Sequence, residues 1–257
     1  MWPRPVIVPG SSRSTLLRLY RTSNQVPSDS AGSGVAWDYT KLRDLLTAER
    51  LGSYFEEAHG DLEGAFSLYE WNMAASAEVT KTTGMVEVVV RNAIDGQLRL
   101  WDAARGHASW LDAAPLDFRG RSDVAKARER ATRFGRVPEV HGKVVAELSL
   151  GFWRYLVASR YLTSLWVPAL HRAFPHGPAD LGARRRSVEN HLKDLMLVRN
   201  RAAHHEPIHR RNLLADLAAS VEVAGWVSAD AGAWVIARSS LAVVVANKPS
   251  FSETILP

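Results

Sequence analysis

Residues 188–207 read VENHLKDLMLVRNRAAHHEP and end on two histidines and a proline. At about 100° per residue, four apolar side chains gather on one side of a helix: Val188, Leu192, Leu195 and Met196. Arg199 falls within that stripe, so we expect it to face the core, and Pro207 ends the helix because it lacks an N–H. A buried guanidinium cannot lose its charge and needs an anion, which is a carboxylate, a neighbouring subunit's group or a phosphate.

Composition bounds the class of protein. The 257 residues, of which 46% are hydrophobic, can bury a substantial core. Neither a signal peptide nor a membrane span is recognisable, and cysteine is absent, which excludes disulfides, thiolate nucleophiles and cysteine zinc sites. We therefore expect a cytoplasmic protein with no membrane association. The net charge of +5 favours polyanionic partners without naming one.

The chain divides into a leader and a helical domain. Residues 1–34 are rich in proline, serine and glycine, which predicts a flexible leader, and the domain is expected over 35–257. Thr40 and Asp61 are predicted N-caps, with a first helix ending near Gly60. Apolar spacing predicts further helices: 62–73, 86–101 after an interruption at Thr82-Thr83-Gly84, 122–134, 139–158, 163–174, 180–205, 209–224 and two short ones in the tail. The fold class is all-α, a helical bundle with extra capping helices.

Two basic stretches are candidate RNA-binding surfaces. Arginine and lysine neutralise backbone phosphates without base contacts, whereas the alternative is an ordinary solvated helix face. The residues assigned to this role are Lys126, Arg128, Arg130, Arg133, Arg184, Arg185 and Arg186.

The segment His205–His209 matches the zinc-protease pattern H-E-x-x-H, which requires both histidines on one continuous helix. Pro207 lies between them and disfavours helical geometry at Glu206. We therefore expect no metal site and no cofactor here.

The phrase Arg199-Asn200-Arg201-Ala202-Ala203-His204, followed by His205-Glu206-Pro207-Ile208, resembles the Abi-like (abortive infection) branch of the HEPN superfamily. Segments upstream agree with it: Leu68–Asn72, Glu87–Asn92 and Ser149–Trp153. The resemblance runs from about Trp37 to Pro249. It implies a HEPN-like helical bundle that dimerises so that two R-x4–6-H motifs share one cleft. It also implies metal-independent RNA cleavage, in phage defence or as a toxin. A third possibility is a toxin that a separate antitoxin protein neutralises.

The resemblance assigns roles to individual residues. Arg199 would bind the scissile phosphate, His204 or His205 would act as base or acid, and Asn200 would orient the histidine. Glu87, Arg91 and Asn92 match an upstream phrase, and would either support Arg199 or form a surface i,i+4 pair between Glu87 and Arg91.

Helix geometry leaves two arrangements open. Five residues apart, Arg199 and His204 point about 140° away from each other. Either the helix unwinds before Pro207, or residues of two subunits complete one site. The competing interpretations are an internal ion pair of Arg199 with histidines capping the helix, and a non-catalytic RNA-binding or protein-interaction module.

Overall fold

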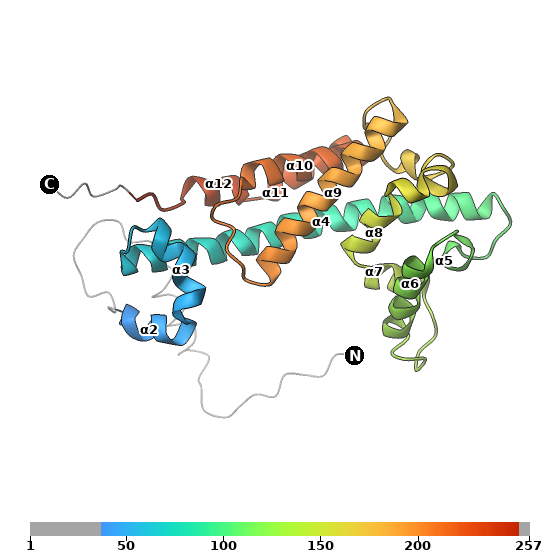
Figure 1. Cartoon of the computed structure of the whole chain (residues 1–257). Coiled ribbons are helices and arrows are strands. Elements are labelled where there is room, and N and C mark those ends of the chain that lie inside the picture. Colours follow the sequence, from blue (N-terminus) through green and yellow to red (C-terminus); the bar gives the residue numbers. More distant parts are fainter. Residues whose placement is uncertain (1–36, 252–257) are drawn as a thin grey trace, which may run out of the picture. The chain divides into compact units, whose positions relative to one another are not determined.

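The computed structural model describes residues 37–251, which are helical and contain no strand. One helix, α4 (Leu62–Ala103), is 42 residues long, and most other helices pack along it (Figure 1). It begins where expected, because Asp61 Oδ2 accepts a hydrogen bond from the Gly64 N–H at 2.9 Å. The expected interruption at residues 82–84 is wrong. The Thr83 hydroxyl donates to the Val79 carbonyl at 2.8 Å, so the helix accommodates it.

Shorter helices surround α4. The predicted leader over residues 1–34 lies outside the described residues. No helix in residues 37–251 is long and apolar enough to cross a membrane. The remaining elements are α2 (Tyr39–Leu46), α3 (Ala48–Glu57), α5 (Trp110–Ala113), α6 (Phe118–Ala131), α7 (His141–Glu147), α8 (Leu150–Leu156), η1 (Ser159–Tyr161), η2 (Leu162–Trp166), η3 (Leu170–Ala173), α9 (Leu181–Ala203), α10 (Leu213–Val227), α11 (Ala229–Arg238) and α12 (Leu241–Ala246).

Two apolar clusters form along α4, and both use residues of α4 and α9. The first includes Val90, Ile94 and Leu98 of α4 with Val188 and Leu192 of α9. The second includes the earlier α4 residues Leu68 and Ala75, together with Val198 and Ala202 of α9. All of these side chains are buried. α9 therefore passes from one cluster to the other between Leu195 and Val198.

Several predicted helices differ from the observed ones. The first is broken at Thr47, whose φ of 71° is left-handed, so it forms α2 and α3. The helix predicted over 139–158 is divided at Leu148, which is extended, with Ser149 capping α8. The stretch 163–174 forms a π-helix and a 3₁₀-helix. α10 starts at Leu213 instead of residue 209 because the Asn212 side chain caps it. The two short tail helices are confirmed.

Helices α10 and α11 cross closely at Gly232. A Cβ placed on Gly232 would lie 3.0 Å from the Gly225 Cα and 3.1 Å from the Val221 carbonyl oxygen. Both neighbours are backbone atoms and cannot rotate away. A Cβ at Gly225, in contrast, meets no atom within 4 Å.

We expect Gly232→Ala to lower the free energy of unfolding by about 1–3 kcal/mol, because the two backbones must separate. Gly225→Ala, the matched control on the facing helix, is expected to raise it by about 0.5–1 kcal/mol through lower unfolded-chain entropy. Urea denaturation of both variants measures the difference. Equal effects of the two substitutions would contradict the close crossing.

Candidate functional site at the C-terminal end of helix α9

The four predicted catalytic residues lie at the end of α9. Arg199, His204 and His205 are exposed, and Asn200 is half-buried. The guanidinium of Arg199 donates from Nη1 to Asn200 Oδ1 at 3.3 Å, and it has no carboxylate within ion-pair distance among residues 37–251. The expectation that Arg199 faces the core is therefore wrong. The same observation excludes an internal ion pair for Arg199 within the described residues.

The direction in which α9 crosses α4 explains the exposure of Arg199. Early in α9 the buried side chains include Val188 and Leu192, and near its end they are Val198 and Ala202. Val198 is about 100° around the helix axis from Arg199. The buried stripe thus moves around α9 as the helix leaves the first cluster and enters the second, and Arg199 is left on the solvent side.

A Schellman motif ends α9 and fixes the double histidine. The His205 N–H donates to the Ala202 carbonyl at 3.1 Å, and the Glu206 N–H donates to the Arg201 carbonyl at 2.8 Å. His205 has a φ of 56°, the left-handed conformation that glycine usually supplies here. Arg50 of α3 donates from Nη1 to the His205 carbonyl at 2.8 Å. The backbone at His205 is therefore held from two sides, while its imidazole stays exposed.

The regular end of α9 excludes one of the two arrangements that the sequence left open, the one in which the helix unwinds before Pro207. The helix continues to Ala203, so it does not unwind between Arg199 and His204. Within one subunit these two side chains then project about 140° apart around the axis. Asn200 and His204 are four residues apart and share a face. Within one subunit Asn200 and His204 thus lie on one face of α9, whereas Arg199 projects away from His204.

The segment after α9 is anchored to α3 and α4 and is not helical. The Ile208 N–H donates to Oδ1 of the buried Asn72 at 2.7 Å. His209 is buried against the Tyr54 ring, with its Nε2 at 3.3 Å from Ser53 Oγ. His205 and His209 therefore do not share a helix, and the geometry that H-E-x-x-H requires is absent. No group of three or more potential metal ligands occurs in the part of the chain that the structure describes.

Glu87, Arg91 and Asn92 lie on α4. They form neither the expected contact with Arg199 nor the expected Glu87–Arg91 pair. Glu87 and Arg91 are half-buried and Asn92 is exposed. Within residues 37–251 no ion pair joins Glu87 to Arg91, and neither contacts Arg199 through a hydrogen bond or ion pair. Arg91 Nε is buried and has no hydrogen-bond partner in the part of the chain that the structure describes. The expected i,i+4 pair is therefore not formed.

Four of the seven predicted RNA-binding residues already have partners inside the protein. Arg184 and Arg185 are buried and donate to the carbonyls of Pro178 and Val157, at 2.7 and 3.0 Å. Arg128 pairs with Asp112 and Arg130 with Glu147. Arg184 and Arg185 hold chain turns in place, so their assignment to an exposed phosphate track is corrected. Lys126, Arg133 and Arg186 are exposed and have no such partner among residues 37–251.

One further cluster lies outside all the site residues that the sequence predicts. His141, at the start of α7, contacts Asp95 Oδ1 through Nε2 at 2.8 Å, and Trp110 Nε1 donates to the same oxygen at 2.8 Å. A cavity of about 880 Å³ beside them is also lined by Arg99 and by Asp102, whose buried Oδ1 has no hydrogen-bond partner among the described residues. The spacing of Asp95, Arg99 and Asp102 on one face of α4 is the pattern that could have indicated it.

We expect His205→Gly to raise the free energy of unfolding by about 0.5–1 kcal/mol, because glycine adopts the left-handed conformation without a Cβ penalty. His205→Ala removes the same imidazole but keeps a Cβ, so it should not stabilise the protein. Thermal or urea unfolding of the two variants distinguishes them. A stability gain with alanine equal to that with glycine would argue against the left-handed assignment.

We expect His209 to make stability depend on pH. Burial lowers the pKa of His209 below its usual 6.5, Arg210 and Lys248 lower it further, and Glu57 opposes them. The unfolded chain therefore binds a proton that the folded chain excludes. This contribution to stability is complete above the unfolded pKa of about 6.5 and is lost as pH falls from there towards the lower folded value.

Urea denaturation between about pH 7 and pH 5 measures this effect. Wild type should lose more stability over that range than His209→Gln, which cannot titrate. His204→Gln, which removes an exposed imidazole from the same segment, serves as the control and should behave like wild type. Identical pH profiles for wild type and His209→Gln would contradict the prediction.

The comparisons with known proteins add no family to this geometry. No protein-family model, curated protein or solved structure matches the chain. The resemblance to HEPN proteins therefore stays a prediction, which rests on the residues of Arg199–Ile208 and the segments upstream.

Proposed function

We propose that the protein is a metal-independent endoribonuclease of the HEPN type, acting in phage defence or as a toxin. One observation carries the proposal. Arg199, near the end of α9, is exposed and has no carboxylate partner among the described residues, and it lies close in sequence to two exposed imidazoles. A guanidinium contacting only a neutral amide keeps its full charge for a phosphate, which it can bind through two N–H groups at once.

The residue types suit RNA cleavage without a metal. A base must take the ribose 2′-hydroxyl proton, and an acid must protonate the leaving 5′-oxygen. Histidine serves either purpose because its reference pKa near 6.5 allows both protonation states at neutral pH. Arg199 would stabilise charge on the phosphate in the transition state. Asn200, one turn before His204, would orient the imidazole.

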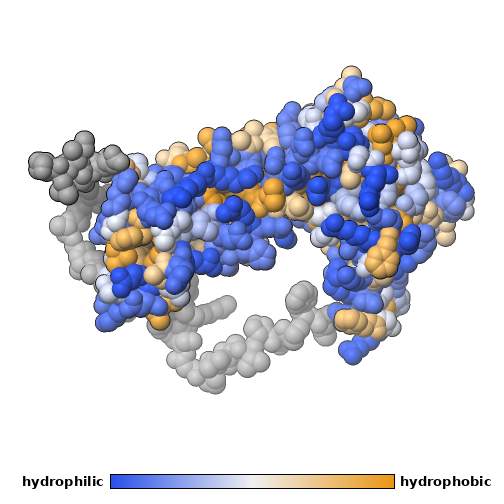
Figure 2. All heavy atoms as spheres, viewed as in Figure 1, coloured by the Kyte–Doolittle hydropathy of each residue, from blue (hydrophilic) through white to orange (hydrophobic). Residues whose placement is uncertain are grey.

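A site that combines Arg199 with His204 then requires two subunits. α9 remains regular to Ala203, so the two side chains diverge within one subunit. Leu197 is 42% exposed and lies on the same face of α9 as Arg201, one turn later, and His204, two turns later. Hydrophilic residues predominate on the face of the molecule in Figure 2, with hydrophobic residues in smaller patches. An exposed leucine beside the histidine is the kind of contact that a twofold interface would bury.

The first test is cleavage of a labelled single-stranded RNA in excess chelator. We expect Arg199→Ala and at least one of His204→Ala and His205→Ala to lose about 10²–10⁴-fold in rate. His191→Ala removes an imidazole from the same helix and serves as the matched control. If all three site variants cleave like wild type, the proposal fails. Binding of RNA without cleavage by wild type would favour the non-catalytic module instead.

A mixed-subunit experiment tests the composite site. Dimers that combine one Arg199→Ala subunit with one subunit carrying both His204→Ala and His205→Ala retain one site with the wild-type arginine and histidines. We expect such dimers to recover about half of the wild-type rate, because one of two symmetric sites is intact. Each variant alone stays inactive. Inactive mixed dimers, verified as dimers by sedimentation, would place both residues in one subunit and contradict the arrangement.

A further inference from the structure

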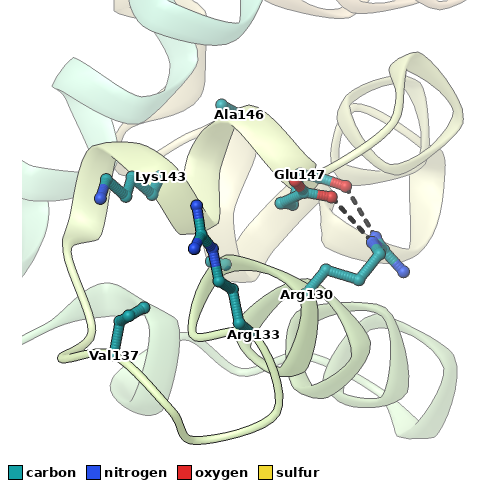
Figure 3. A pocket seen from close by; sticks show the side chains of 7 residues that line it. Arg130, Arg133, Val137, Lys143, Ala146 and Glu147 are labelled. Carbon is teal, nitrogen blue, oxygen red and sulfur yellow. Dashed lines mark hydrogen bonds and ion pairs between the residues drawn. The ribbon is translucent and has the colours of Figure 1, made fainter. Parts of the chain in front are cut away.

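A second basic site lies between the end of α6 and helix α7, on different elements from the α9 motif. It is a cavity of about 390 Å³. Figure 3 shows Arg133 on the segment after α6 and Lys143 on α7, both at the border of the cavity. Arg130 is paired with Glu147 beside the cavity. Arg133 follows α6, and Lys143 is the third residue of α7. Residues from two elements thus enclose one basic cavity.

The charges in this cavity are not balanced. Glu147 is the one carboxylate in its lining, and it already accepts from Arg130 Nε at 2.8 Å. Arg130 donates in addition to the Glu147 carbonyl at 2.8 Å. Arg133 and Lys143 have no ion pair or side-chain hydrogen bond within residues 37–251. Two cations therefore line one cavity, and no carboxylate among residues 37–251 pairs with either of them.

The backbone beside the cavity presents an aromatic ring to solvent. Arg133 and Phe134 have φ angles of 50° and 57°, left-handed values that cost non-glycine residues about 1–2 kcal/mol each. Glu129 and Thr132 hold this turn, accepting hydrogen bonds from the Phe134 N–H at 2.7 Å and the Gly135 N–H at 3.1 Å. The Phe134 side chain is 78% exposed. These left-handed residues end α6, since the Arg133 N–H donates to the Arg130 carbonyl at 3.1 Å, and the turn fixes the backbone from which the Phe134 ring projects.

We infer that this cavity binds single-stranded RNA, with a backbone phosphate between Arg133 and Lys143 and a base stacked on Phe134. The inference rests on the proposed function for the choice of RNA as ligand. Cations that contact phosphates and aromatic rings that stack on bases are how proteins bind single strands without sequence preference. Duplex RNA cannot offer an unstacked base to Phe134. The site holds the substrate and does not supply the proton-transfer groups.

Fluorescence anisotropy with a labelled single-stranded RNA of about 12 nucleotides tests the site, since such sites span about 4–16 nucleotides. All measurements are made in a background that carries both His204→Ala and His205→Ala, so that cleavage does not consume the probe. We expect Phe134→Gly to weaken binding by about tenfold, by loss of one stacked base, while the left-handed turn is relieved and the fold is not destabilised. Arg133→Gln and Lys143→Gln should each lower the slope of log affinity against log salt by about 0.7.

Matched controls come from α11. Arg238→Gln removes an exposed charge and Trp234→Ala an aromatic ring that is 47% exposed, and neither should change affinity. Equal affinity of wild type for duplex and single-stranded RNA would overturn the stacking contact. Unchanged binding in all three site variants would overturn the inference even if the protein cleaves RNA. Weakened binding in those variants would support it even if wild type proves unable to cleave.

Discussion

The packing of α9 across α4 is the contact on which the candidate site depends. α9 is buried early through Val188 and Leu192 and late through Val198 and Ala202, so different sides of one helix meet two clusters. This change of side places Arg199 in solvent. It also brings the end of α9 over α3, where Arg50 contacts the carbonyl of His205. The position of the motif thus follows from how the helices cross, and the exposed guanidinium is a result of that crossing.

Some arginines of this protein bind backbone carbonyls inside the fold, and others remain exposed. The number of arginines in the sequence does not distinguish the two groups. Arg185 donates to the Val157 carbonyl, which ends α8 and has no partner within that helix. Arg184 likewise holds Pro178 before α9. Arg133 and Arg199, in contrast, remain exposed without carboxylate partners among the described residues. The basic net charge therefore overestimates how many cationic side chains are free to bind an anion. The hydrogen bonds of the individual arginines show which ones are free among the described residues.

The sequence predicted the all-α class and the limits of α9 well, because apolar spacing and capping residues are local signals. It failed where distant contacts decide the outcome. Thr82-Thr83-Gly84 has a helix-breaking composition, yet packing on both sides and the Thr83–Val79 hydrogen bond keep α4 continuous. The prediction assumed that one side of α9 is buried along its whole length, and it therefore placed Arg199 in the core. The sequence does not reveal the angle at which α9 crosses α4, and this angle decides which side is buried near Arg199. The Asp95–His141 pair joins residues 46 positions apart, and no local pattern links them.

The unbroken length of α4 has a consequence for how such a chain can be divided. Each apolar cluster takes one wall from a different part of the same helix. The cluster at the start of α4 is completed by Val198 and Ala202 of α9, so a cut within Leu62–Ala103 would separate early α4 residues from their partners, and we expect the N-terminal fragment not to fold by itself. The described part of the chain therefore has two apolar clusters that are joined by shared helices and are expected to fold together. Gene fission or transfer of one half to another chain would therefore require a replacement for the missing helix.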